Sequence, residues 1–116
     1  MPQILVDYSA NVNFDHLGFA KELHPLITEV IDTTVPECKT VFRPAGQYAV
    51  GDGTDGRAMV LVEIKILAGR GVELRAELSA RVLALLERYV DAPAALAVEV
   101  TELDRATYRF VHHPGR

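Results

Sequence analysis

The 116-residue chain has one cysteine, no tryptophan and no long hydrophobic run. A lone Cys38 cannot form an internal disulfide, which is typical of proteins from the reducing cytoplasm. The longest apolar stretches, such as residues 59–62, are interrupted by charge within a few positions, so we expect no membrane-spanning segment. The chain begins without a basic segment and an apolar core, so we expect no export signal and a cytoplasmic location.

Charge and metal-ligand patterns are also missing. Twelve Lys and Arg against sixteen Asp and Glu give a net charge of −4 with no basic run, so we expect neither nucleic acid nor an anionic membrane as partner. Histidine and cysteine do not occur at ligand spacing, so we expect no metal site. Hydrophobic residues make up 49% of the chain, enough for a core, and the length suits one domain over residues 1–116.

The first half of the chain, residues 2–56, begins with a strand and a helix. Residues 4–8 are a short apolar, β-branched run that predicts a strand. Asn13 or Asp15 can then cap a helix. Its apolar residues recur at helical spacing, at Phe19, Leu23, Ile27 and Ile31. Pro25 lies inside this helix, so we expect a kink or an early break there.

A weaker strand and a turn complete this half. Residues 40–48 are interrupted by Pro44 and Gly46, which favours a strand at the edge of a sheet. Residues 51–56 have the glycine and aspartate content of a turn, in which we expect the aspartates to be turn formers rather than acids.

The second half, residues 57–116, repeats the order of the first. Residues 58–67 alternate between two faces, one of them strongly apolar, which predicts the best strand of the chain. Residues 72–90 have the apolar stripe of an amphipathic helix, and residues 95–103 form a closing strand. The tail that follows is polar and has no clear pattern.

The repeat predicts an α/β (α+β) fold in which two β-α-β halves form a four-stranded sheet with two helices on one face. Each crossover should be right-handed and join parallel strands. The other face of the sheet also carries apolar residues, and the chain has no third helix to cover it. We therefore expect the protein to be an oligomer.

Three segments carry a family resemblance: residues 1–9, where Pro2 follows the initiator methionine and opens a strand, residues 48–53, and residues 65–70. In this order they resemble the tautomerase superfamily, most closely 5-carboxymethyl-2-hydroxymuconate isomerase, over about residues 2–105. The resemblance implies a homotrimer and a cofactor-independent isomerase of aromatic-compound catabolism. It implies that the N-terminal proline is the base that moves a proton in an unsaturated hydroxy or keto diacid.

Pro2 has a plain interpretation as well, because proline at position 2 merely permits removal of Met1. Without Met1 it is a secondary amine, and α-amino groups ordinarily titrate near pH 7.7–8.0. Apolar surroundings and nearby cations lower such a pKa towards neutrality, where the amine can remove a proton next to a carbonyl. The second half begins its strand internally, so the chain predicts one catalytic amine and one site.

Arg70 ends the strongest strand between Gly69 and Gly71, which allow close approach of a ligand to the backbone. Taken alone, it is an ordinary loop arginine. The resemblance implies that its guanidinium binds a substrate carboxylate or the oxygen that gains charge in the reaction. We therefore predict Pro2 and Arg70 as the catalytic residues.

A second arginine of the family is missing, because its place is occupied by Val41. Arg43 lies two residues further and on the same face of a strand, and Lys39 shares that face, so either can bind substrate in its stead. For Arg43, a plain surface arginine is an equal interpretation.

Phe110 is the last predicted substrate-binding residue. The resemblance implies that it and Tyr108 form a wall of the site in a neighbouring subunit, although the tail does not match the ending of the family. The unmatched tail and Val41 keep an alternative open, a non-catalytic or promiscuous tautomerase-fold oligomer with another ligand.

Overall fold

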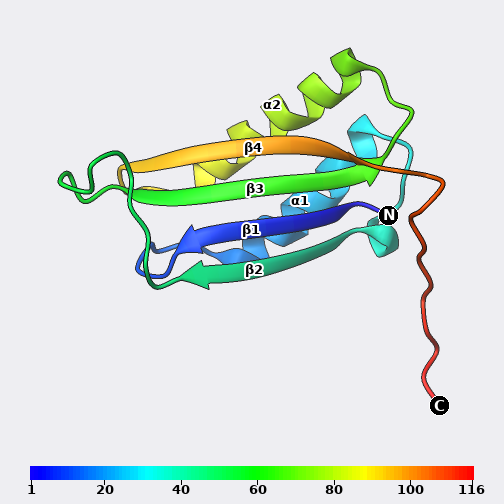
Figure 1. The fold of residues 1–116 in the computed structure, drawn as a ribbon, viewed down its shortest axis with the longest axis horizontal. Helices are drawn as coiled ribbons and strands as arrows, with labels where there is room; N and C mark the ends of the chain where they lie inside the picture. The colour runs from blue at the N-terminus through cyan, green and yellow to red at the C-terminus, as the bar shows by residue number, and fades with distance from the viewer.

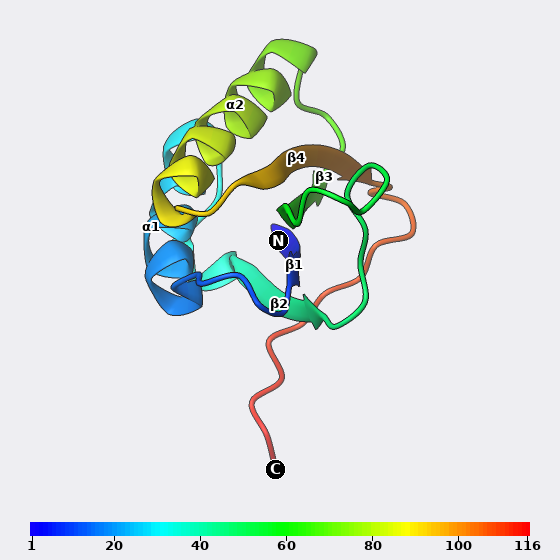
Figure 2. The same cartoon turned by 90° about the vertical axis from the view of Figure 1, so that its left-hand side faces the viewer.

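A four-stranded sheet with two helices packed on one face forms the core of the protein in a computed structural model that describes residues 1–116 (Figure 1). The strands are β1 (Gln3–Ser9), β2 (Lys39–Ala45), β3 (Ala58–Leu67) and β4 (Ala94–Leu103). The helices are α1 (His16–Val30) and α2 (Val72–Tyr89), with a short 3₁₀ helix η1 (Val35–Glu37) before β2. Figure 2 shows both helices on the same side of the sheet. The predicted fold class is confirmed.

The sheet has the strand order β2-β1-β3-β4. Within each half the two strands are parallel, β1 with β2 and β3 with β4, as the crossover helices require. The two halves join through an antiparallel pairing of β1 with β3, in which Gln3 lies opposite Lys65. The start of β1, the start of β2 and the end of β3 therefore lie at the same end of the molecule.

Alternation along the strands separates a buried face from an open face. Ile4 and Val6 of β1 and Val60, Val62 and Ile64 of β3 are nearly inaccessible and face the helices. The helices contribute their own fully buried residues to this core, which include Phe19, Leu23, Ile27, Leu78, Val82 and Leu86. The hydrophobic stripes of the sequence therefore form one continuous core between sheet and helices.

Helix α1 differs from its prediction at Pro25. Asp15 is the N-cap, and its side chain accepts a hydrogen bond from the backbone of Gly18. The helix then runs unbroken through Pro25, so the expected early break does not occur. Pro25 is exposed, and so is Lys21, the residue four positions earlier whose carbonyl loses its helical partner there. Packing of the opposite face, for example of Leu23 and Ile27, keeps the helix continuous.

The strand predicted over residues 40–48 ends earlier than expected, at Ala45. Its position at an edge of the sheet is confirmed. Tyr48 lies outside the strand, where its hydroxyl donates a hydrogen bond of 2.9 Å to the side-chain oxygen of Asn11. Gly46 marks the departure from the sheet, because no strand partner follows Ala45.

The open face of the sheet carries a mixture of apolar and charged side chains. Val41 and Leu61 are 46% and 41% exposed there, next to the ion pair between Arg43 and Asp7. No helix covers this face (Figures 1 and 2). Neither α1 nor α2 is long and apolar enough to cross a membrane.

Candidate active site

Pro2 is buried at the start of β1, with less than 2% of its surface exposed. Its carbonyl oxygen accepts a hydrogen bond of 3.1 Å from the backbone of Lys39, which ties the first residues to β2. The α-amino group of Met1 donates to the carbonyl and to the carboxylate of Glu37, at 3.0 and 3.2 Å. Burial lowers the pKa of this amine, and the hydrogen bond that it donates to Glu37 opposes that shift.

A shallow hollow of about 250 Å³ lies between the first residues of β1 and β2, and its lining begins at Gln3, the residue after Pro2. Its lining consists of Gln3, Ile4, Leu5, Lys39, Thr40 and Val41. Leu5 and Val41 give it apolar walls on the open face of the sheet, and Lys39 supplies the only charge in the lining. We call this space the β1–β2 hollow. One cation between apolar walls suits an acid with an apolar body.

Lys39 is held in place by two contacts beside the hollow. Its Nζ donates a hydrogen bond of 2.8 Å to the carbonyl of Glu37 and lies 4.1 Å from the centre of the Phe110 ring. An ammonium group over an aromatic face is attracted by the ring's electron density. The structure thus brings together three predicted site residues, Pro2, Lys39 and Phe110.

The C-terminal tail supplies contacts that the sequence had not indicated. The hydroxyl of Tyr108 accepts a hydrogen bond of 3.0 Å from Gln3, and Nε2 of His112 lies 3.5 Å from a carboxylate oxygen of Glu37. The N-terminal amine and His112 both lower the pKa of Glu37. The sequence does give one indication of these contacts, the spacing of Tyr108, Phe110 and His112. Side chains two positions apart in an extended segment point to the same side.

Arg70 lies in the loop between β3 and α2, at the same end of the molecule as Pro2 (Figure 1). The loop turns at Gly69, whose φ of +124° is accessible to glycine and strained for other residues. The guanidinium donates to the carbonyls of Leu67 and Asp32, at 3.1 and 3.2 Å. Arg70 therefore joins the ends of β3 and α1 and does not line the β1–β2 hollow.

Arg43 lies away from the hollow. It forms a two-pronged ion pair with Asp7, with distances of 2.9 and 2.8 Å, and this pairing raises the pKa of Arg43. Four residues along a strand separate it from Lys39, or about 13 Å. The structure thus places Lys39, and not Arg43, next to Pro2 of the same chain.

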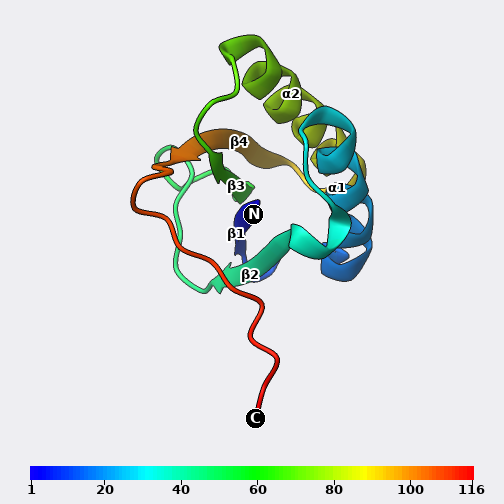
Figure 3. The ribbon, with the colours of Figure 1, turned by 90° about the vertical axis from the view of Figure 1, so that its right-hand side faces the viewer.

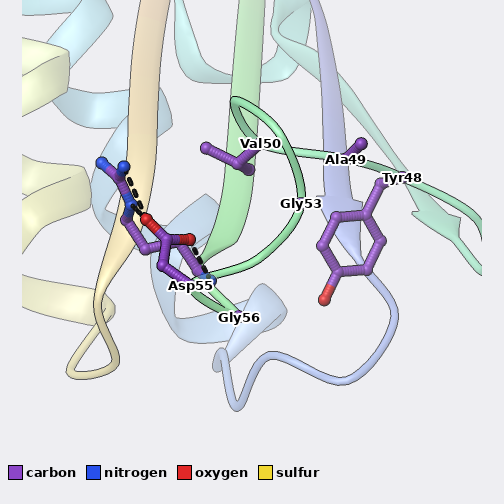
Figure 4. A pocket seen from close by; sticks show the side chains of 7 residues that line it. Tyr48, Ala49, Val50, Gly53, Asp55 and Gly56 are labelled. Atoms are coloured by element: carbon purple, nitrogen blue, oxygen red, sulfur yellow. Dashed lines mark hydrogen bonds and ion pairs between the residues drawn. The ribbon is translucent and has the colours of Figure 1, made fainter.

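A second hollow, of about 140 Å³, lies at the opposite end of the molecule, in the loop between β2 and β3 (Figure 4). Its acid, Asp55, pairs with Arg57 at 2.7 Å, which lowers the pKa of the carboxyl group. Asp52 accepts hydrogen bonds from the backbone and hydroxyl of Thr54. Both aspartates thus form turns, as the sequence predicts, and neither is placed as a free acid.

His24 and Cys38 pack between α1 and the start of β2. Nε2 of His24 lies 2.7 Å from the hydroxyl of Thr40, and burial lowers the pKa of His24. Burial likewise raises the pKa of the Cys38 thiol, so this cysteine is poorly suited to nucleophilic chemistry. These residues therefore contribute to packing and not to the candidate site.

No protein-family model and no curated protein sequence matches the chain. Solved structures do resemble it. A 5-carboxymethyl-2-hydroxymuconate isomerase from Deinococcus radiodurans has a TM-score of 0.81 at 19% identity, with 97% of this chain and 90% of that chain covered. A macrophage migration inhibitory factor-like protein from Entamoeba histolytica has a TM-score of 0.71 at 22% identity, with 96% of each chain covered.

A fused 4-OT that forms a symmetric trimer has a TM-score of 0.74 at 14% identity, with 91% of each chain covered. At such identities the likeness shows the fold alone. The chain therefore has the tautomerase-like fold that the sequence resemblance implies.

Proposed function

We propose that the protein is a cytoplasmic, cofactor-independent isomerase of the tautomerase type, which moves a proton in an unsaturated hydroxy or keto diacid. Pro2, freed from Met1, is the base. The main support is the position of the buried Pro2, which is hydrogen-bonded to Lys39 and lies one residue from the hollow that Lys39 lines. The fold is shared with a 5-carboxymethyl-2-hydroxymuconate isomerase. The sequence resemblance supports the same reaction.

The chemistry requires an amine that is neutral near pH 7. Burial and the charge of Lys39 already lower the pKa of the α-amino group in the chain that carries Met1. The same surroundings would act on the Pro2 nitrogen once Met1 is removed. The neutral amine takes a proton from the hydroxyl of a hydroxy diene or from a carbon next to the carbonyl of a keto acid. The electron pair of that O–H or C–H bond moves into the conjugated system. The same proton then returns to a carbon further along.

Two cations have roles in this proposal. Lys39 binds a carboxylate of the substrate in the β1–β2 hollow. Arg70, at the same end of the sheet, stabilises the oxygen that becomes negative as the proton leaves. Arg70 has donors to spare, because a guanidinium offers five N–H groups and two carbonyls accept from it here.

One observation favours the second candidate, a promiscuous or non-catalytic tautomerase-fold oligomer with another ligand. Val41 stands where the resemblance expects an arginine, and Arg43 is bound to Asp7. The β1–β2 hollow therefore offers one carboxylate site from its own chain. A ligand with a single carboxylate would fit this arrangement.

The test of the proposed reaction compares two forms of the chain, one without Met1 and one with an N-terminal extension that cannot be removed. Intact-mass spectrometry establishes which form is present. We expect the extended chain to lose about 10²–10⁴-fold in kcat/KM, since its Pro2 nitrogen is an amide and cannot act as a base. Ultraviolet absorbance of 5-carboxymethyl-2-hydroxymuconate follows the reaction. Equal rates for the two forms, with unchanged circular dichroism, would exclude Pro2 as the base.

We also propose a homotrimer in which the open face of the sheet is covered. The fused 4-OT structures, which are symmetric trimers, and the exposed Val41 and Leu61 support it. We expect Leu61→Glu to lower the mass of the assembly measured by light scattering, because the change puts a carboxylate into the apolar contact. Leu17→Glu is the control, on an exposed residue of α1 away from that face. Equal masses for wild type and Leu61→Glu would count against this interface.

A further inference from the structure

The C-terminal segment of residues 107–112 follows the side of the sheet away from the helices and passes the start of β2 (Figures 2 and 3). It has no regular structure, yet three of its side chains contact the rim of the β1–β2 hollow. They are Tyr108 on Gln3, Phe110 on Lys39, and His112 on Glu37. We call this segment the strap.

Phe110 contacts Lys39, the one cation in the lining of the hollow. Its ring lies 4.1 Å from Nζ of Lys39, and the carbonyl of Glu37 accepts from the same ammonium group. A carboxylate that approached Lys39 would have to compete with the ring. The closed strap therefore masks the one charged group that the hollow presents to an acid.

His112 fastens the strap without contacting Lys39. Its imidazole packs edge-on against the Phe110 ring, with 4.7 Å between the ring centres, and pairs with Glu37 at 3.5 Å. In the chain that carries Met1, Glu37 also accepts from the amino group of Met1. The contacts of the strap with Gln3, Lys39 and Glu37 do not involve Met1.

The contacts that hold the strap are individually weak. His112 is 61% and Glu37 35% exposed, and pairs at that exposure typically shift an equilibrium by about two- to five-fold. A cation–π contact at the surface has a similar effect. The hydrogen bond between Tyr108 and Gln3 is a single neutral contact, of comparable size. A segment held by three such contacts opens often, in contrast to the strands of the core.

We propose that the strap is a gate of the β1–β2 hollow: when closed it shields Lys39, and its release, governed by His112 and Phe110, gives an acid access to the site. The closing and opening are properties of the chain alone. Only the consequence for substrate entry rests on the function proposed above.

The test measures access to Lys39 without any substrate. Acetic acid N-hydroxysuccinimide ester acylates accessible lysines, and mass spectrometry gives the rate at each one. Lys21, exposed on α1, is an internal reference in every sample. The variants are His112→Ala, Phe110→Ala and the double variant. His113→Ala is the matched control, because the side chain of His113 accepts a hydrogen bond from the backbone of Gly115 and has no hydrogen bond or ion pair with Glu37 or Lys39.

We expect His112→Ala to raise the Lys39-to-Lys21 ratio about two- to five-fold, since labelling follows the open population. This variant reports release of the strap, because His112 does not cover Lys39 itself. The Lys39-to-Lys21 ratio of the double variant should exceed that of either single variant, and the ratio of His113→Ala should equal that of wild type. A ratio unchanged in His112→Ala and in the double variant, or an equal rise in His113→Ala, would overturn the gate. Circular dichroism verifies the fold of each variant.

Discussion

Pro2→Ala is expected to lower kcat/KM on 5-carboxymethyl-2-hydroxymuconate by about 10²–10⁴-fold, the usual contribution of a positioned general base. The proline ring fixes φ and holds its nitrogen rigidly in the buried start of β1. Alanine leaves a primary amine that is free to turn. The carbonyl of residue 2, which accepts from Lys39, is retained, so the strand pairing should persist.

Pro93→Ala is the matched control for this experiment. Pro93 is exposed at the start of β4, at the opposite end of the sheet from Pro2, and its carbonyl likewise accepts a backbone hydrogen bond, from Ala58. This variant should retain its rate. If Pro2→Ala kept full activity while intact mass showed that Met1 was absent, the rigid proline ring would not be required, and only the N-terminally extended chain would test the amine itself.

Much of the fold could be predicted because the strongest signals are local. The alternation of residues 58–67 determines which face of β3 is buried, and the observed burial follows it residue by residue. The predicted stripe of α2 likewise contains Leu78, Val82 and Leu85, which are buried, and Leu86 beside them is buried as well. The break predicted at Pro25 was wrong, because proline removes only one backbone hydrogen bond of the helix. The packing of α1 against its neighbours outweighs that loss.

The site was predictable only in part, because it depends on contacts between residues distant in the sequence. Pro2 was proposed from the family resemblance, and Lys39 because it shares a strand face with Val41 and Arg43. The sequence could not tell whether Lys39 or Arg43 lies next to Pro2, because this depends on the register of β1 and β2. The observed register pairs Arg43 with Asp7 and Lys39 with Gln3. The approach of His112 to Glu37 spans 75 positions of the chain and has no local pattern at all.

The largest effect on stability is expected for Leu23→Ala in α1. Leu23 is completely buried between the helix and the sheet. Removing its branched end loses the free energy of burial and leaves a cavity, because the surrounding core relaxes only partly. We expect the free energy of unfolding to fall by about 2–5 kcal/mol.

Leu17→Ala provides the control on the same helix, because Leu17 is 76% exposed. The change of side chain and the small gain in helix propensity are the same at both positions, so the difference between the variants isolates burial. Leu17→Ala should stay within about 0.5 kcal/mol of wild type. Urea unfolding at one fixed protein concentration measures both, since association of chains would make stability depend on concentration. If both variants lowered the free energy of unfolding equally, α1 would not pack through the face that carries Leu23.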